Sequence, residues 1–186
     1  MAEFISAATR LPLISVPIFL LVGAAVAGGR GILWATLCLL LTSGLSLLYL
    51  FYLVRSGKVR DSSRIPQSER VGPLRVVALL HVGAFLVSVI LGAPAALQAI
   101  LLSYAISTLL FALLAPLTNL SLHAAGVTGA AVCMIFVFGV WGILGALFIP
   151  PVLWARRYLN RHTPLELVAG VLAGGGGTCI AFWLTG

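Results

Sequence analysis

Long apolar stretches separated by short polar segments run along almost the whole chain. They cover residues 11–28, 32–54, 73–92, 95–117, 124–140, 142–155 and 167–184. Several of them reach the ~20 residues with which an α-helix crosses the hydrocarbon core of a bilayer. None shows the alternation of apolar and polar residues that a membrane-spanning β-strand needs. The pattern predicts an all-α protein, a polytopic transmembrane helical bundle.

Glycine and proline residues stand where the predicted helices should end. The sequence "AGGRG" follows the first stretch, "GAP" the third, and "AP" closes the fourth, and such residues interrupt helices. The pair Pro150–Pro151 lies inside the sixth stretch, where it should kink or end a helix. We expect six to seven spans, the number depending on whether 142–155 crosses the membrane, in a single membrane-embedded domain over residues 1–186.

The composition excludes an ordinary water-soluble protein. Of the 186 residues, 61% are hydrophobic and only 8% are charged, against about 25% charged in a soluble domain. Cys38, Cys133 and Cys179 fall in three different apolar stretches without metal-ligand spacing, so we interpret them as small core residues. We therefore expect an integral membrane protein of the plasma or inner membrane.

The charged residues gather in a few polar segments. Six of the eleven Lys and Arg residues lie between residues 55 and 75, and three lie between 156 and 161. A milder polar break, "LTNLSLH", covers 117–123. Two apolar stretches separate each segment from the next, and an even number of crossings returns the chain to the same side. All three segments are thus expected at one membrane face.

These segments contain the side chains with which proteins bind a tetrahedral oxyanion. Guanidinium groups bind phosphate oxygens in pairs, and hydroxyl groups add further donors. The candidates are Lys58, Arg60, Asp61, Arg64, Ser121 and Arg156. Other cations at the ends of the apolar stretches are interpreted as solvated charges that set the topology; these are Arg55, Arg70, Arg75 and Arg161.

Two histidines and a glutamate complete the set. His162 and His123 would supply a nucleophile or base and an acid for the leaving oxygen, as phosphoryl transfer requires. Glu166 follows His162 by one helical turn, close enough to hold an imidazole N–H and fix its tautomer. This chemistry needs no metal, and no cofactor is expected. In structural terms alone, Arg156, His162 and Glu166 would be an interfacial salt-bridge cluster, and Ser121 a helix cap.

Three motifs in these segments resemble the signatures of the type 2 phosphatidic acid phosphatases, integral-membrane lipid phosphate phosphatases related to vanadium haloperoxidases. That family carries K-x6-R-P, then P-S-G-H, then S-R-x5-H-x3-D. The third motif appears here as Arg156, five residues, His162, three residues, and Glu166 in place of Asp. The second appears as "LSLH", with Ser121 two residues before His123, and the first as "KVRDSSRIP".

The resemblance covers residues 58–166 and implies an active site at one membrane face, in a signature-bearing core of 58–184. It implies that His162 attacks phosphorus to form a phosphohistidine, that Glu166 orients it, and that His123 protonates the departing oxygen. The phosphate ligands that it implies are Lys58, Arg64, Ser121 and Arg156, with Arg60 and Asp61 as further candidates in the altered first motif. The implied substrate is a lipid phosphate monoester or a prenyl (di)phosphate, hydrolysed without a metal.

Two other functions stay open. A catalytically silent phospholipid-binding protein is favoured by the loss of Pro and Gly from the second motif. A small anion or lipid transporter would need charged or polar residues along a path through the membrane. Only His81 is a candidate for such a residue. A neutral His81 that bonds a neighbouring helix is the structural alternative, and close helix packing is the interpretation of the "GGGG" run at 174–177.

The net charge of +7 indicates which partners to expect. The charge lies in loops at the membrane ends, so the bilayer and its anionic lipid head groups are expected partners and nucleic acid is not. The positive-inside rule favours a cytoplasmic site, whereas members of the resembled family commonly face outward. The sequence leaves the orientation and the oligomeric state open.

Overall fold

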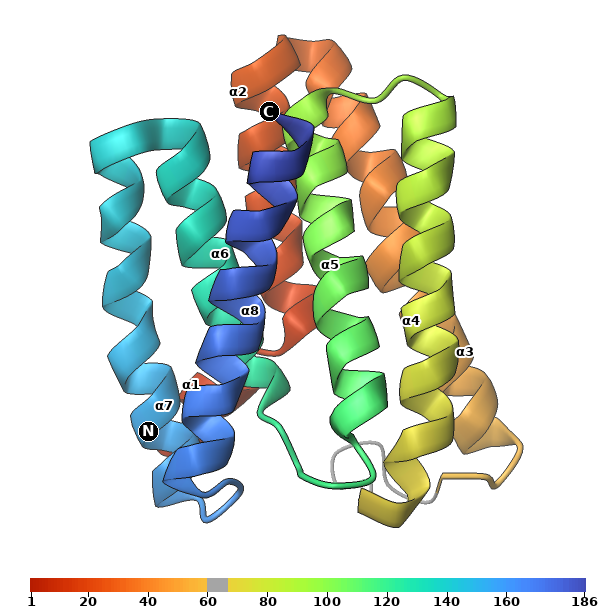
Figure 1. Cartoon of the computed structure of the whole chain (residues 1–186), viewed down its shortest axis with the longest axis vertical. Helices are drawn as coiled ribbons and strands as arrows, with labels where there is room; N and C mark the ends of the chain where they lie inside the picture. The colour runs from red at the N-terminus through yellow and green to blue at the C-terminus, as the bar shows by residue number, and fades with distance from the viewer. Residues whose placement is uncertain (60–66) are drawn as a thin grey trace.

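The computed structural model describes residues 1–59 and 67–186, and in this part of the chain every regular element is a helix (Figure 1). The described elements are, in chain order, α1 (Ala2–Ala8), α2 (Leu11–Leu39), the π-helical turn η1 (Leu40–Gly44), α3 (Leu45–Arg55), α4 (Gln67–Ile90), α5 (Ala95–Leu114), α6 (Leu122–Phe138), the 3₁₀ segment η2 (Gly139–Phe148), α7 (Ile149–Tyr158) and α8 (Pro164–Thr185). The prediction of an all-α protein is confirmed for the described residues.

Five helical segments among the described residues are long and apolar enough to cross a membrane. They are Pro12–Arg55, Glu69–Ile90, Ala95–Leu114, Leu122–Tyr158 and Pro164–Thr185. Large apolar side chains cover the outside of the bundle, and Leu33, Ile90 and Trp183 are 73%, 80% and 80% exposed. A contiguous apolar surface of this kind is typical of a protein that faces lipid. The structure is thus compatible with an integral membrane protein.

Two of these segments are about twice as long as a bilayer requires, and both reverse direction. Pro12–Arg55 has 44 residues and Leu122–Tyr158 has 37, whereas ~20 residues suffice for one crossing. In the first, Gly28 adopts a φ of 55°, and the chain descends beside the part that it has just climbed (Figure 1). The two arms touch through glycines, since a Cβ on Gly23 would lie 2.3 Å from the carbonyl oxygen of Gly31.

The second reversal follows α6 and also depends on glycine. Gly139 has a φ of 59°, a conformation that glycine adopts without steric cost. The chain then returns through η2 and α7 beside α6 (Figure 1). A Cβ on Gly142 would lie 2.1 Å from the carbonyl oxygen of Met134. Pro150 and Pro151 lie in the first turn of α7, where proline is tolerated.

The contact at Gly142 predicts a large effect of a single methyl group. Gly142→Ala should force the two arms apart and lower the free energy of unfolding by at least about 2 kcal/mol, the usual range for overpacking. Thermal unfolding of the detergent-solubilised protein measures this loss. Gly176→Ala is the matched control, because nothing lies within 4 Å of a Cβ at that position. Equal melting temperatures for the two variants would show that the close contact is absent.

The described parts of the polar segments gather at one end of the bundle. Figure 1 shows the end of α3, the start of α4, the α5–α6 loop and the α7–α8 connection at the same end as α1. The C-terminus lies at the opposite end. Polar groups that are far apart in the sequence are therefore brought within reach of one another at the N-terminal end.

Glycines in α8 bring the α6 and α8 starts together. A Cβ on Gly170 would lie 2.7 Å from the carbonyl oxygen of Ser121, and a Cβ on Gly174 would lie 2.1 Å from that of Ala125. Such close approach of two helix backbones requires residues without a side chain. The "GGGG" run thus serves close helix packing, as predicted, and it fixes where α8 begins relative to α6.

His81, a polar residue inside the bundle, is paired with its neighbours. The ring of His81 contacts the hydroxyls of Ser46 and Thr108, at 3.2 and 3.3 Å, which confirms the interpretation of His81 as a histidine that bonds its neighbours. Cys38 and Cys133 are buried, as expected of core residues. The same prediction is wrong for Cys179, which is exposed on the outer face of α8.

Candidate functional site

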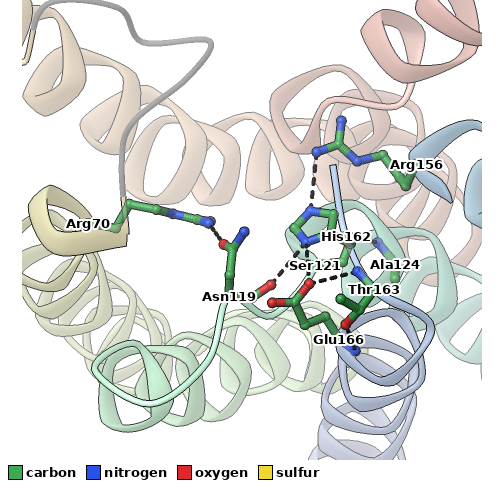
Figure 2. Close-up of polar contacts among 8 residues, drawn as sticks. All are labelled: Arg70, Asn119, Ser121, Ala124, Arg156, His162, Thr163 and Glu166. Carbon is green, nitrogen blue, oxygen red and sulfur yellow. Dashed lines mark hydrogen bonds and ion pairs between the residues drawn. The ribbon is translucent and has the colours of Figure 1, made fainter. Parts of the chain in front are cut away.

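The candidate site lies where the α5–α6 loop meets the α7–α8 connection. Figure 2 shows His162 between the side chain of Arg156 and the backbone of Asn119. The backbone N–H of Ser121 donates to the carbonyl oxygen of Glu166 at 3.4 Å, which ties the two connections together. The structure therefore brings the second and third sequence motifs into one cluster.

Both ring nitrogens of His162 have defined partners. Its Nδ1 lies 2.9 Å from the carbonyl oxygen of Asn119. A carbonyl can only accept a hydrogen bond, so Nδ1 carries the proton. In the neutral ring Nε2 then keeps its lone pair, and it accepts from the guanidinium of Arg156 at 3.2 Å. His162 is 7% exposed, and its unprotonated nitrogen is fixed in identity and direction.

Glu166 lies close to His162 but does not make the hydrogen bond that the sequence analysis assigned to it. Its carboxylate oxygen is 3.8 Å from Nδ1 of His162, too far for a hydrogen bond. The same oxygen accepts the backbone N–H of Thr163 at 2.8 Å, and the Thr163 hydroxyl accepts from the N–H of Glu166. This capping box starts α8. Asn119, not Glu166, therefore holds the tautomer of His162.

Burial, and after it the neighbouring Arg156 guanidinium, lower the pKa of His162 from 6.5 to about 4. The hydrogen bond to Asn119 and the carboxylate of Glu166 act in the opposite direction and only partly offset this effect. His162 is thus neutral at neutral pH, as a nucleophile must be. Its contact with Glu166 is a charge–dipole contact and not an ion pair.

The lowered pKa of His162 predicts a loss of stability in acid. Between about pH 6.5 and the folded pKa of about 4, the unfolded chain binds a proton that the folded chain does not, so stability falls as the pH falls. Allowing for solvent screening, wild type should lose on the order of 2 kcal/mol more than His162→Gln across this window. Thermal unfolding at a series of pH values measures the difference, and parallel curves for the two proteins would refute it.

Arg156 connects the two histidine-bearing regions through its guanidinium. It lies in the last turn of α7, where a cation is favoured by the helix dipole. Its Nη1 donates to the hydroxyl of Ser6 at 2.7 Å, and its Nη2 donates to Nε2 of His162. Its buried Nε–H has no partner among the described residues. A half-satisfied guanidinium beside a neutral histidine is a suitable binding group for an anion.

His123 lies at the start of α6 and also contacts Ser6. Ser121 is the N-cap of this helix, and its hydroxyl accepts the N–H of Ala124 at 3.4 Å. Nε2 of His123 donates to the backbone carbonyl of Ser6 at 3.1 Å, and therefore carries the ring proton. The structure gives Ser121 the role of a fully buried cap, and directs the Nε2 proton of His123 at the Ser6 carbonyl.

Arg70 belongs to the site, although the sequence analysis interpreted it as a solvated charge. Its guanidinium donates to the side-chain oxygen of Asn119 (Figure 2), and it is close enough to Glu166 for their charges to interact. The expected helix began at residue 73, whereas α4 begins at Gln67. This longer helix places Arg70 in its first turn, facing the α5–α6 loop.

The first sequence motif contributes less than expected in the described part of the chain. Lys58 is exposed, and its ammonium lies 5.5 Å from the centre of the Tyr52 ring, within α3 and its C-terminal turn. Its described contact is thus with its own helix and not with His162. Arg60, Asp61 and Arg64 lie outside the described residues.

Comparison with protein-family models, with curated proteins and with solved structures gave no match. Function must therefore be argued from the site. The cluster contains a neutral imidazole with a directed lone pair, a second imidazole with a directed proton, and two guanidinium groups. These are the parts that transfer of a phosphoryl group to a nitrogen nucleophile requires.

Proposed function

We propose that this chain is a lipid phosphate phosphatase that hydrolyses a phosphate monoester or a prenyl diphosphate through a phosphohistidine at His162, without a metal. The observation that carries the proposal is the arrangement of His162, whose Nδ1–H is held by Asn119 while its Nε2 lone pair points at the Arg156 guanidinium. A purely structural salt bridge would need a charged His162, and burial keeps this ring neutral. The resemblance to the type 2 phosphatidic acid phosphatases agrees with this proposal.

The reaction has two steps. When the phosphate dianion is bound, its charge favours a doubly protonated His123. Nε2 of His162 attacks phosphorus, the bond from phosphorus to the lipid oxygen breaks, and the imidazolium of His123 gives its Nε2 proton to the departing oxygen and becomes neutral. A water molecule then loses a proton to the now neutral Nε2 of His123 and attacks the phosphohistidine. The P–N bond breaks, inorganic phosphate leaves, and both histidines return to their starting states.

Arginines stabilise the charge that develops on the equatorial oxygens of the phosphoryl group. Arg156 turns its Nη donors from their resting partners to the phosphate and adds its Nε–H, unpartnered in the described part of the chain, and Arg70 approaches from the Asn119 side. Preorganised cations in a water-poor site stabilise a phosphoryl transition state most effectively. Lys58 and Arg64 remain candidates for phosphate binding, with Arg60 and Asp61 as further candidates, and Ser121 acts by fixing the start of α6.

The membrane arrangement follows from the two reversals. If each long segment crosses twice, Pro12–Arg55 and Leu122–Tyr158 supply four crossings and the other three helices supply three, so that the chain has seven spans. The site then lies at one membrane face, where the N-terminal end of the bundle meets the head groups. A substrate chain would remain among the helices or in lipid while its phosphate meets the arginines. The charge bias favours the cytoplasmic face of a plasma or inner membrane.

Phosphate release from purified, detergent-solubilised protein tests the proposed function. The substrates are phosphatidate, phosphatidylglycerophosphate and prenyl mono- and diphosphates, assayed with EDTA and with or without vanadate. Release that survives EDTA and is blocked by vanadate supports a histidine-dependent phosphatase. If a folded protein binds these lipids without releasing phosphate, it is the silent phospholipid-binding protein that the altered second motif would favour.

Glu166→Gln separates the charge of this residue from its role in the helix cap. Glutamine keeps an oxygen that can accept the Thr163 N–H, so α8 should start normally. The substitution removes the negative charge 3.8 Å from Nδ1 of His162. In the wild type this charge stabilises the positive charge that the imidazole ring gains when it bonds to phosphorus. We expect kcat to fall by roughly tenfold with little change in KM. An unchanged kcat would restrict Glu166 to its capping role.

A further inference from the structure

The short helix α1 lies across the candidate site. It packs against α7, with Ala2 buried while Met1 and Phe4 are 93% and 76% exposed. A helix of seven residues has little stability of its own in water. Its position therefore depends on the contacts that it makes with the rest of the protein.

Two of these contacts are made by a single residue, Ser6, and both partners belong to the candidate site. The Ser6 hydroxyl accepts from Nη1 of Arg156 at 2.7 Å. The Ser6 backbone carbonyl accepts from Nε2 of His123 at 3.1 Å. Ser6 thus presents one oxygen atom to a guanidinium and another to an imidazole N–H.

A phosphate group would need the same two donors. In the proposed reaction, Arg156 binds an equatorial oxygen and the Nε2–H of His123 approaches the leaving oxygen. A carbonyl oxygen carries no hydrogen and competes directly with a phosphate oxygen for the His123 proton. The phosphate and Ser6 therefore exclude each other, and α1 must shift before substrate can reach both residues.

We propose that α1 is a lid that closes the site in the resting state, with the two oxygens of Ser6 in the positions of two phosphate oxygens. This inference rests on the proposed function. Substrate displaces α1, and the exposed apolar residues Met1 and Phe4 give the displaced helix a partner in the lipid surface. Thr9 and Arg10, the two residues between α1 and α2, are where the chain would bend.

Binding of orthovanadate tests the lid, with vanadate serving as the probe for the phosphate site. Deletion of residues 2–8 removes the lid, and Ser6→Ala removes only the hydroxyl bond to Arg156. Both variants should bind vanadate more tightly than wild type, by roughly threefold to tenfold for the loss of one competing hydrogen bond. Ser56→Ala is the matched control, because this serine bonds within its own helix end, to Leu53. Equal or weaker binding by both variants would overturn the lid.

A second measurement separates failure of the lid from failure of the proposed function. Carbethoxylation of His123 by diethylpyrocarbonate, followed by mass spectrometry, reports access to this ring without any phosphate ligand. If α1 covers the site, His123 should react several-fold faster in the deletion variant. If His123 reacts faster in the deletion variant but neither wild type nor the variants bind vanadate, the phosphate site is contradicted. In that case α1 still covers His123. An unchanged reaction rate would overturn the lid whatever the fate of the phosphatase.

Discussion

Replacing His162 with alanine should abolish phosphate release, with a loss of at least about 10⁴-fold in kcat, because no other described imidazole offers a lone pair to Arg156. The fold should survive, since His162 lies in the short connection between α7 and α8 and not within a helix. Phosphate release and thermal unfolding, measured on the same preparation, check both parts. A variant that melts normally and still turns over at the wild-type rate would remove His162 from the chemistry.

His81 supplies the control for the choice of histidine. It bonds Ser46 and Thr108 in the interior of the bundle and contacts no residue of the candidate site. His81→Gln should therefore retain turnover, apart from the fraction of protein that it destabilises. The two variants, His81→Gln and His162→Ala, could instead lose the same amount of activity at equal stability. The loss in His162→Ala would then be no evidence that His162 is the nucleophile.

Arg156→Gln should produce the second-largest effect, a fall of roughly 10²- to 10³-fold in kcat/KM, the usual cost of removing one donor to a developing oxyanion. Most of the loss should appear in kcat, because the guanidinium interacts most strongly with the transition state. The values of kcat and KM for one lipid phosphate, measured for wild type and Arg156→Gln, show how the loss divides between the two constants. Arg157→Gln is the matched control, since Arg157 is exposed on the same turn of α7. Equal effects of the two substitutions would reduce the role of Arg156 to general surface charge.

The helical fold was largely predictable because its determinants are local. Apolar stretches of about membrane length, broken by glycine and proline, predicted the helices and the reversal at "AGGRG", whereas the sequence left open whether 142–155 crosses the membrane. The spacing of Arg156, His162 and Glu166 on either side of a helix break was also visible. What the pattern could not give was the closeness of the arms, which depends on the absence of a Cβ at Gly23 and Gly142.

The site was less predictable because several of its contacts come from groups that carry no sequence signature. The partner of His162 is a backbone carbonyl, at Asn119, and a carbonyl is present at every residue. Ser6 reaches Arg156 across 150 residues of sequence. Arg70 was misread because the start of its helix was placed six residues too late.

The role of Glu166 shows where a readable signal was overlooked. The sequence Thr163-Pro-Leu-Glu166 is a capping box, a pattern that predicts the start of a helix. Its carboxylate is then committed to the Thr163 N–H and is not available as a hydrogen-bond partner for His162. Recognising the cap would have directed the search for the orienting group elsewhere.

The most direct test of the account is to trap the phosphorylated enzyme. Purified protein is mixed with a ³²P-labelled lipid phosphate, quenched in alkali within one turnover, and digested for mass spectrometry. The account predicts one labelled site, on Nε2 of His162, because Nδ1 is occupied by its hydrogen bond to Asn119. Label on another residue, or full phosphate release with no labelled histidine at any time, would contradict it.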